Sequence, residues 1–193
     1  MAATAARVTS VARQLTAERG VSGFPVEEVC ERAGISRRTF FNYFASKDDA
    51  VLGRSLHRGD DAYVAEFLAR GPSGDLLDDL AWLTARRWLE ADMTIARARE
   101  VHAAFQAEPR LFARFVEHTV ADQQSDVDLV ERREGLPRGD LRATAAVQII
   151  GSLATSAVQA FLAEGNDTGY TELLTRRLAA GRALLSPDPE RTS

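Results

Sequence analysis

Apolar residues recur along this chain every three or four positions, which is the spacing of one face of an α-helix. Stretches rich in glycine or proline separate these periodic segments, and no segment is a convincing strand. The pattern predicts an all-α fold of about nine helices. The expected helices cover residues 8–19, 26–33, 37–44, 47–70, 75–91, 94–106, 110–134, 141–164 and 171–185.

The chain ends and the helix expected at 47–70 carry further predictions. Residues 1–7 and the tail from Pro187 are small or polar, so we expect both to be disordered. Gly53 and Gly59 would soften the helix at 47–70, which could then act as a mechanical link between the first three helices and the rest of the chain. The alternative is that the two glycines allow close packing of helices.

Residues 26–44 form two short periodic segments joined by a glycine turn. Gly34 suits the left-handed backbone that often ends a helix, and Ser36 is placed to cap the next one. A helix, a short turn with glycine and a second short helix form the helix-turn-helix pattern of DNA-binding proteins. The apolar face of the first helix is expected to consist of Val26, Val29, Cys30 and Ala33.

The second short helix separates its residues by chemistry. Phe40 and Phe44 are four positions apart and should pack inward. Arginine and asparagine side chains pair with base edges, whereas threonine and tyrosine hydroxyls suit phosphates. We therefore expect the base readers to be among Arg37, Arg38 and Asn42, and the phosphate contacts to be Thr39, Tyr43 and Lys47.

Lys47 is the only lysine in the chain. Ser46 is placed to cap a helix that would carry this lysine in its first turn, where a positive charge opposes the helix dipole. That position favours a phosphate contact. The alternative is an ordinary solvated lysine.

The stretch AGISRRTFFNYFASKDDAV resembles the DNA-binding signature of TetR-family transcriptional regulators. The resemblance covers Val8 to about Leu52, and the rest of the chain resembles the family only in its helical plan. Two features depart from the family pattern. Phe41 stands where the family usually has a tyrosine that contacts a phosphate, and Phe24-Pro25 replaces the usual threonine or serine before the second helix.

The resemblance implies a homodimeric repressor that binds a palindromic DNA operator and is released by a small molecule. It places a DNA-binding domain at 1–52 and a ligand-binding and dimerisation domain at 53–193. Regulators that are similar in the RRTFFNYF stretch often respond to fatty acyl-CoA or other lipophilic molecules. A hydrophobic effector is therefore the expected ligand.

Two sets of residues in the second domain are candidates for these functions. The helices at 141–164 and 171–185 are apolar on most sides, so a four-helix contact between two subunits would cover them, although a purely intrachain core is the alternative. That contact is expected to include Ile150, Leu153, Val158, Phe161, Leu174 and Leu178. The expected pocket, whose residues could instead be ordinary core, consists of Trp82, Leu83, Phe105, Phe112, Phe115, Ile149 and Leu153, with Arg86 or His102 as the polar contact.

Charge is consistent with DNA binding only in the first part of the chain. Residues 1–52 hold seven Arg and Lys against six Asp and Glu, and residues 53–193 hold seventeen against twenty-two. The net charges of +1 and −5 together give −4. Such a weakly basic domain must depend on the local placement of its arginines and on two copies binding together.

Composition indicates a cytoplasmic protein without a membrane segment. Every 18-residue stretch contains polar residues, and the N-terminus lacks the layout of a signal peptide. A single cysteine, Cys30, cannot form an internal disulfide, and its helical spacing predicts that it is buried.

An enzyme is the rival class, and little in the sequence supports it. His57, His102 and His118 fall on different helices or helix ends, and there is no His-x-x-x-His, cysteine pair or glycine-rich phosphate loop. We therefore expect no catalytic site, cofactor or metal. A DNA-binding protein with no small-molecule inducer stays open as the alternative function.

Overall fold

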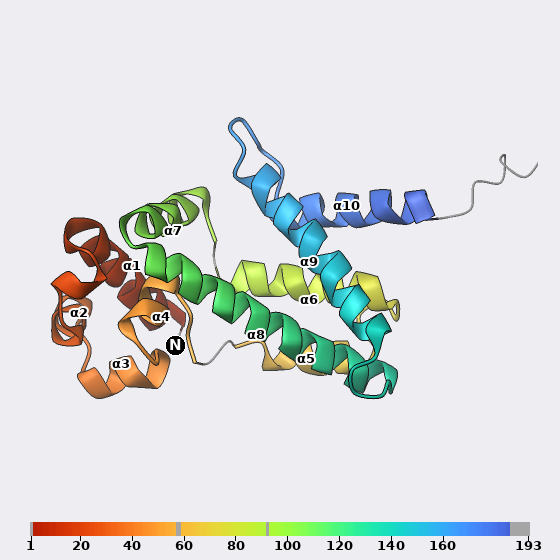
Figure 1. The fold of residues 1–193 in the computed structure, drawn as a ribbon, viewed down its shortest axis with the longest axis horizontal. Helices are drawn as coiled ribbons and strands as arrows, with labels where there is room; N and C mark the ends of the chain where they lie inside the picture. The colour runs from red at the N-terminus through yellow and green to blue at the C-terminus, as the bar shows by residue number, and fades with distance from the viewer. Residues whose placement is uncertain (1, 57–58, 92, 186–193) are drawn as a thin grey trace, which may run out of the picture. The chain divides into compact units, whose positions relative to one another are not determined.

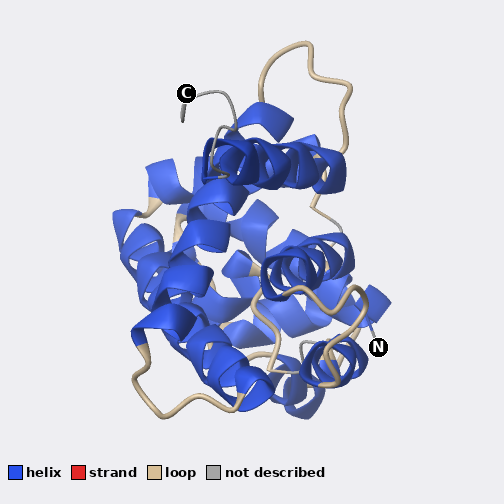
Figure 2. Ribbon diagram, turned by 90° about the vertical axis from the view of Figure 1, so that its right-hand side faces the viewer, coloured by secondary structure: helices blue, strands red, loops and turns tan. Residues whose placement is uncertain are grey.

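The computed structural model describes residues 2–56, 59–91 and 93–185, and this part of the chain is helical with no strand (Figures 1 and 2). The predicted all-α class is confirmed. The tail predicted to begin at Pro187 lies outside the described residues, and so does His57. The elements are α1 (Ala2–Arg19), a 3-10 turn η1 (Val21–Gly23), α2 (Val26–Ala33), α3 (Arg37–Tyr43), α4 (Lys47–Leu52), α5 (Asp61–Leu68), α6 (Leu76–Glu90), α7 (Ile95–Ala107), α8 (Pro109–Glu134), α9 (Leu141–Phe161) and α10 (Tyr170–Leu185).

The single helix predicted at 47–70 is wrong, because the structure has two helices there. Gly53 adopts a left-handed conformation with φ of 75° and donates its N–H to the carbonyls of Ala50 and Asp49, which ends α4. The next helix, α5, begins at Asp61. A softened continuous helix therefore cannot be the mechanical link.

The disordered arm predicted at residues 1–7 is also wrong, because α1 begins at Ala2. Its first turns are rich in alanine, the strongest helix former, and this local preference favours the helix. Arg7 is anchored as well, since its Nε donates a hydrogen bond of 2.8 Å to the carbonyl of Ala33.

The helices form two compact units. Of the described residues, the first unit contains 2–56, 59, 91 and 93–121, and the second contains 60–90 and 122–185. α8 contributes residues 109–121 to the first unit and 122–134 to the second. The boundary at residue 52 does not coincide with this division, because α1 and α4 pack against α7. The functional division at that residue stays a prediction.

The core of the first unit joins the helix-turn-helix to α1. Apolar side chains of α1 pack against the buried faces of α2, α3 and α4. Cys30 is buried, which raises the pKa of its thiol, so the prediction of a buried cysteine is confirmed. The buried members of this core are Val8, Ala12, Leu15, Val21, Phe24, Val29, Cys30, Ala33, Phe40, Phe44, Ala50, Val51, Ala104 and Leu111.

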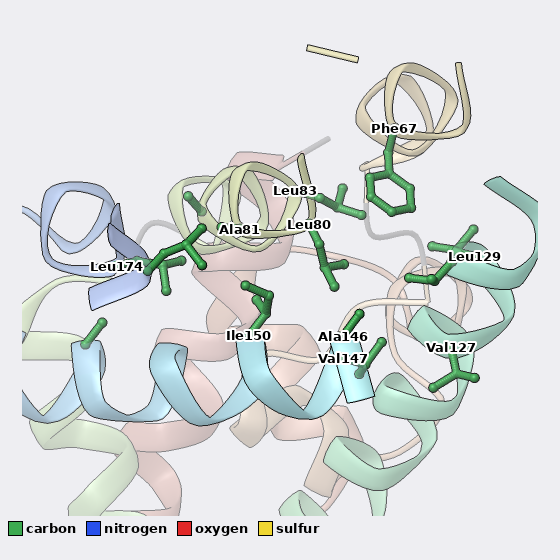
Figure 3. Close-up of a cluster of buried hydrophobic side chains, with 14 of the residues drawn as sticks. Phe67, Leu80, Ala81, Leu83, Val127, Leu129, Ala146, Val147, Ile150 and Leu174 are labelled. Atoms are coloured by element: carbon green, nitrogen blue, oxygen red, sulfur yellow. The ribbon is translucent and has the colours of Figure 1, made fainter. Parts of the chain in front are cut away.

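The core of the second unit is built from α5, α6, the C-terminal part of α8, α9 and α10, whose side chains turn toward one another in Figure 3. Ile150, Leu174 and Leu178 are buried in this core by their own chain. For these three residues, the alternative of a purely intrachain core therefore holds. Trp88 stacks on Tyr170 at 4.2 Å between ring centroids, and burial raises the pKa of Tyr170 to about 12.

A buried ion pair fixes one turn of the second unit. Arg133 and Asp79 are fully buried and form an ion pair. Asp79 also accepts hydrogen bonds from the N–H and hydroxyl of Ser73, at 2.7 and 2.6 Å. Burial alone would raise the pKa of Asp79, but the hydrogen bonds from Ser73 and Arg133 outweigh it and the pKa is lowered.

α9 is long and apolar enough to cross a membrane, judged by length and composition alone, and is the only described helix that meets this test. Its most apolar window has a mean hydropathy of 1.3 and is 28% buried. Core helices of soluble proteins meet the same test. Since Ala146, Ile150 and Ala157 of α9 are buried in the core of the second unit, composition here does not indicate a membrane span.

Candidate DNA-binding surface

The turn between α2 and α3 is fixed by the two caps predicted from the sequence. Gly34 has a φ of 64° and donates its N–H to the carbonyls of Cys30 and Glu31. Ser36 accepts a hydrogen bond of 3.0 Å from the N–H of Thr39. These caps set the direction in which α3 leaves the turn.

One face of α3 is buried and the other is exposed. Phe40 and Phe44 are fully buried, with ring centroids 5.7 Å apart, as predicted. The ring of Phe41 is partly exposed and meets Phe40 edge to face at 5.2 Å. The predicted DNA-contacting residues of α3 are Arg37, Arg38 and Asn42, which are exposed, and Thr39 and Tyr43, which are half-buried.

Arg37 is held by two groups that the sequence did not indicate. Its Nη1 lies 2.8 Å from Oε1 of Glu27, on α2, and its guanidinium lies 5.6 Å from the ring centroid of Phe41. Both charged side chains are well exposed, Arg37 by 67% and Glu27 by 57%. Glu27 is ten positions before Arg37, so helical periodicity within α2 or α3 could not have paired them.

The other polar residues of α3 differ in the hydrogen bonds that they make within the protein. Within the part of the chain that the structure describes, the side chains of Arg38 and Asn42 have no hydrogen-bond or ion-pair partner. The hydroxyl of Thr39 lies 2.8 Å from that of Ser36, which supports the cap. The backbone carbonyl of Tyr43 accepts a hydrogen bond from the N–H of Leu56.

Lys47 has an internal role that neither prediction for it included. Its ammonium group donates hydrogen bonds to the carbonyls of Val21 and Phe24, at 2.7 and 2.5 Å, and lies 4.8 Å from the ring centroid of Phe24. An ammonium group has three donors, so one is left for another partner. The phosphate contact stays a prediction, while Lys47 is not simply a solvated lysine.

The segment that leads into α2 is held from a second side. The N–H of Val21 donates a 3.0 Å hydrogen bond to Oε1 of Glu108, which lies between α7 and α8. Lys47 and Glu108 thus bind the carbonyl and the N–H of the same residue. Because the N-cap residue of α2 is Pro25, which makes no side-chain cap hydrogen bond, these contacts help to fix where the helix starts.

α4 is held against the N-terminal part of α8 by polar contacts. Asp49 is buried, and its Oδ1 lies 2.8 Å from Nε2 of His118 and 3.6 Å from Nε of Arg114. Arg110 lies 3.7 Å from Asp48. The three residues of α8 recur every four positions and so lie along one face, against the acidic first turn of α4.

The predicted ligand-binding residues fall into separate sets. In the first unit, the ring of Phe105 packs on those of Phe112 and Phe115, at 5.6 and 5.5 Å, and His102 is exposed. The remaining residues lie in the second unit: Trp82, Leu83, Arg86, Ile149 and Leu153. A single pocket formed by both sets stays a prediction.

Arg86 is the most distinctive residue of the second set. Its guanidinium lies over the ring of Tyr63 at 4.4 Å, and its Nη2 donates a 2.7 Å hydrogen bond to the hydroxyl of that tyrosine. Its Nε is buried without a partner among the described residues. Sequence reasoning missed Tyr63. Within the same described ranges, no group of three or more His, Cys, Asp or Glu could hold a metal ion.

A glycine turn joins α2 to α3, and α3 exposes arginine and asparagine side chains. This arrangement is typical of helix-turn-helix DNA-binding proteins. Residues 8–52 match the family model described as bacterial regulatory proteins, tetR family. This match supports a TetR-family transcriptional regulator whose helix-turn-helix DNA-binding domain lies at the N-terminus. No curated protein matches the chain.

Proposed function

We propose that the protein is a repressor that binds a palindromic operator as a homodimer and is released by a hydrophobic small molecule. The observation that supports DNA readout is the exposed face of α3, where the side chains of Arg38 and Asn42 have no partner within the described residues. Arginine can grip guanine through two acceptors, and asparagine can do the same with adenine. Arg37, Arg38 and Asn42 are the proposed base readers.

Thr39, Tyr43 and Lys47 are the proposed phosphate contacts. Tyr43 is half-buried beside the exposed face of α3, which supports a contact from its hydroxyl. Lys47 could donate its one remaining hydrogen to a phosphate while it keeps both carbonyls. Phosphate contacts of this kind would fix α3 in the major groove without reading sequence.

The proposed dimer would bring two copies of α3 to the two halves of the operator. Exposed apolar side chains on and beside α9 and α10 support it: Ile149 is 42% exposed and Leu184 is 86% exposed. Leu153, Val158 and Phe161 are partly buried and remain candidates. Ile149, Leu162 and Leu184 replace the buried Ile150, Leu174 and Leu178 in the proposed contact.

The proposed response to a ligand runs through α8 instead of a softened helix at 47–70. α8 belongs to both compact units, and its N-terminal part holds α4 through Arg114 and His118. A ligand that shifts α8 would therefore act on the helix that follows α3. The resemblance in the RRTFFNYF stretch supports a hydrophobic, acyl-CoA-like effector, with Arg86 as a candidate contact for a polar or anionic group.

The first experiment is a selection of duplexes from a random library with the full chain, followed by anisotropy titrations. The proposal predicts enrichment of a palindromic sequence and a complex that contains two chains. If no duplex is enriched over the starting library, specific DNA readout by α3 is refuted.

The second experiment uses a long-chain acyl-CoA as the probe. Linkage requires that a ligand which weakens DNA binding is itself bound less tightly by the DNA complex, by the same factor. Equal affinities of the acyl-CoA for free and DNA-bound protein would exclude it as an inducer. A regulator with no small-molecule inducer is the second candidate, and it gains support if lipophilic compounds of several classes give the same result.

A further inference from the structure

Glu27 and Arg37 form a charge pair on the exposed side of the helix-turn-helix. The carboxylate on α2 meets the guanidinium on α3 at 2.8 Å, and the Phe41 ring lies beside the guanidinium. Arg37 is therefore already engaged before any DNA is bound. The charge that it would offer to a phosphate is offset in a DNA-binding segment whose net charge is only +1.

The pair affects phosphate contacts and base contacts differently. A phosphate that approaches Arg37 brings a second negative charge close to Glu27, so the phosphate must displace the carboxylate or be repelled by it. A guanine edge is neutral and needs only two donors of the guanidinium. Arginine has five donors, so Glu27 can keep its contact while Arg37 binds the base.

We propose that Glu27 is a specificity-determining residue, which weakens the contact of Arg37 with phosphates of unmatched DNA and permits its contact with a matched base. This inference rests on the proposed binding of DNA through α3. A residue that weakens the complex with unmatched DNA more than the complex with matched DNA raises specificity without adding affinity. Both side chains are exposed, so the effect is modest, up to about fivefold in affinity.

The test compares Glu27→Gln with Glu31→Gln, which removes the same charge one turn further along α2. Glu31 is exposed and has no ion pair within the ranges that the structure describes, so it controls for a general change in charge. Each variant is titrated with a mixed-sequence 30-base-pair duplex and with the duplex that the wild-type chain selects. Affinities are measured at several salt concentrations by fluorescence anisotropy.

Glu27→Gln is expected to tighten binding to the mixed duplex by about three- to fivefold, and to change binding to the selected duplex less. Its salt slope on the mixed duplex should steepen by about one per subunit, because Arg37 then gains a phosphate contact. Glu31→Gln should leave the slope and the specificity ratio unchanged. In an Arg37→Gln background, the effect of Glu27→Gln should disappear.

Equal effects of Glu27→Gln and Glu31→Gln on both duplexes would overturn the inference, as would a Glu27→Gln effect that persists without Arg37. Circular dichroism of each variant checks that the fold is retained. The proposed function is tested separately, because its failure is the absence of any selected duplex for the wild-type chain. If a duplex is selected and Glu27 has no specific effect, only the inference about Glu27 fails.

Discussion

Replacement of Lys47 by methionine tests whether this lysine stabilises the helix-turn-helix from within. Methionine keeps an unbranched apolar side chain but removes the ammonium group that binds the carbonyls of Val21 and Phe24. Each such charged hydrogen bond contributes about 1.5–3 kcal/mol, and the contact with the Phe24 ring adds about 0.5–1 kcal/mol. Ordering the lysine side chain costs up to about 2 kcal/mol. We expect the free energy of unfolding to fall by about 2–4 kcal/mol.

The assay is urea denaturation followed by circular dichroism at fixed protein concentration. Both tryptophans, Trp82 and Trp88, lie in the second unit, so their fluorescence reports that unit and not the site of the change. The matched control is Arg38→Met, which removes an exposed cation of α3 and should change stability by less than about 0.5 kcal/mol. If Lys47→Met has as small an effect as this control, the stabilising role of Lys47 is refuted.

DNA titrations of the same variant separate positioning from phosphate contact. Loss of a phosphate contact should weaken binding to all duplexes and lower the salt slope by about one per subunit. Loss of positioning alone should weaken binding to the selected duplex while the salt slope stays the same. Because the structure leaves one donor of Lys47 available, we expect both effects in Lys47→Met.

Three further predictions concern readout, acid stability and assembly. Arg38→Ala should reduce the binding free energy by about 1–3 kcal/mol at one base pair of the selected duplex and relax the base preference there. An equal loss of affinity for the mixed duplex would mean that Arg38 contacts the phosphate backbone of DNA instead of a base. Since the folded pKa of Asp79 is lowered, its contribution is present above the ordinary carboxylate pKa and is lost as the pH falls through the folded value. Asp79→Asn should therefore reduce stability by about 3–5 kcal/mol near pH 7, measured by tryptophan fluorescence in urea, and flatten the acid dependence of stability. Ile149→Glu should give folded monomers in sedimentation, whereas Ile150→Glu should unfold the second unit; a folded Ile149→Glu dimer would exclude that residue from the contact.

Local features of the sequence determined most of the helices and the helix-turn-helix itself. Gly34, Ser36 and Ser46 each cap a helix as predicted, because capping depends on residues only three or four positions away. The buried and exposed faces of α3 likewise follow from the spacing of its two buried phenylalanines. The helix-turn-helix signature is also local, and it lies within the residues that match the family model.

Local features did not determine the structure where two local preferences competed. Within a periodic segment Gly53 predicts a weak point in a helix, but its backbone adopts the left-handed conformation that ends α4. Residues 1–7 were expected to be disordered because they are terminal, although their alanines favour a helix. In each case the residue types were compatible with both outcomes.

Only the tertiary structure decided which charged groups meet. Lys47 lies 26 residues from Val21, and Glu108 lies 87 residues from it, so no periodic pattern could pair them. The pairing of Glu27 with Arg37 depends on the angle between two short helices. The burial of Ile150, with Ile149 beside it exposed, depends on which side of α9 faces α6 and α10. Apolar periodicity identifies the helices that must be covered, whereas the neighbour that covers each face is set by packing across the whole unit.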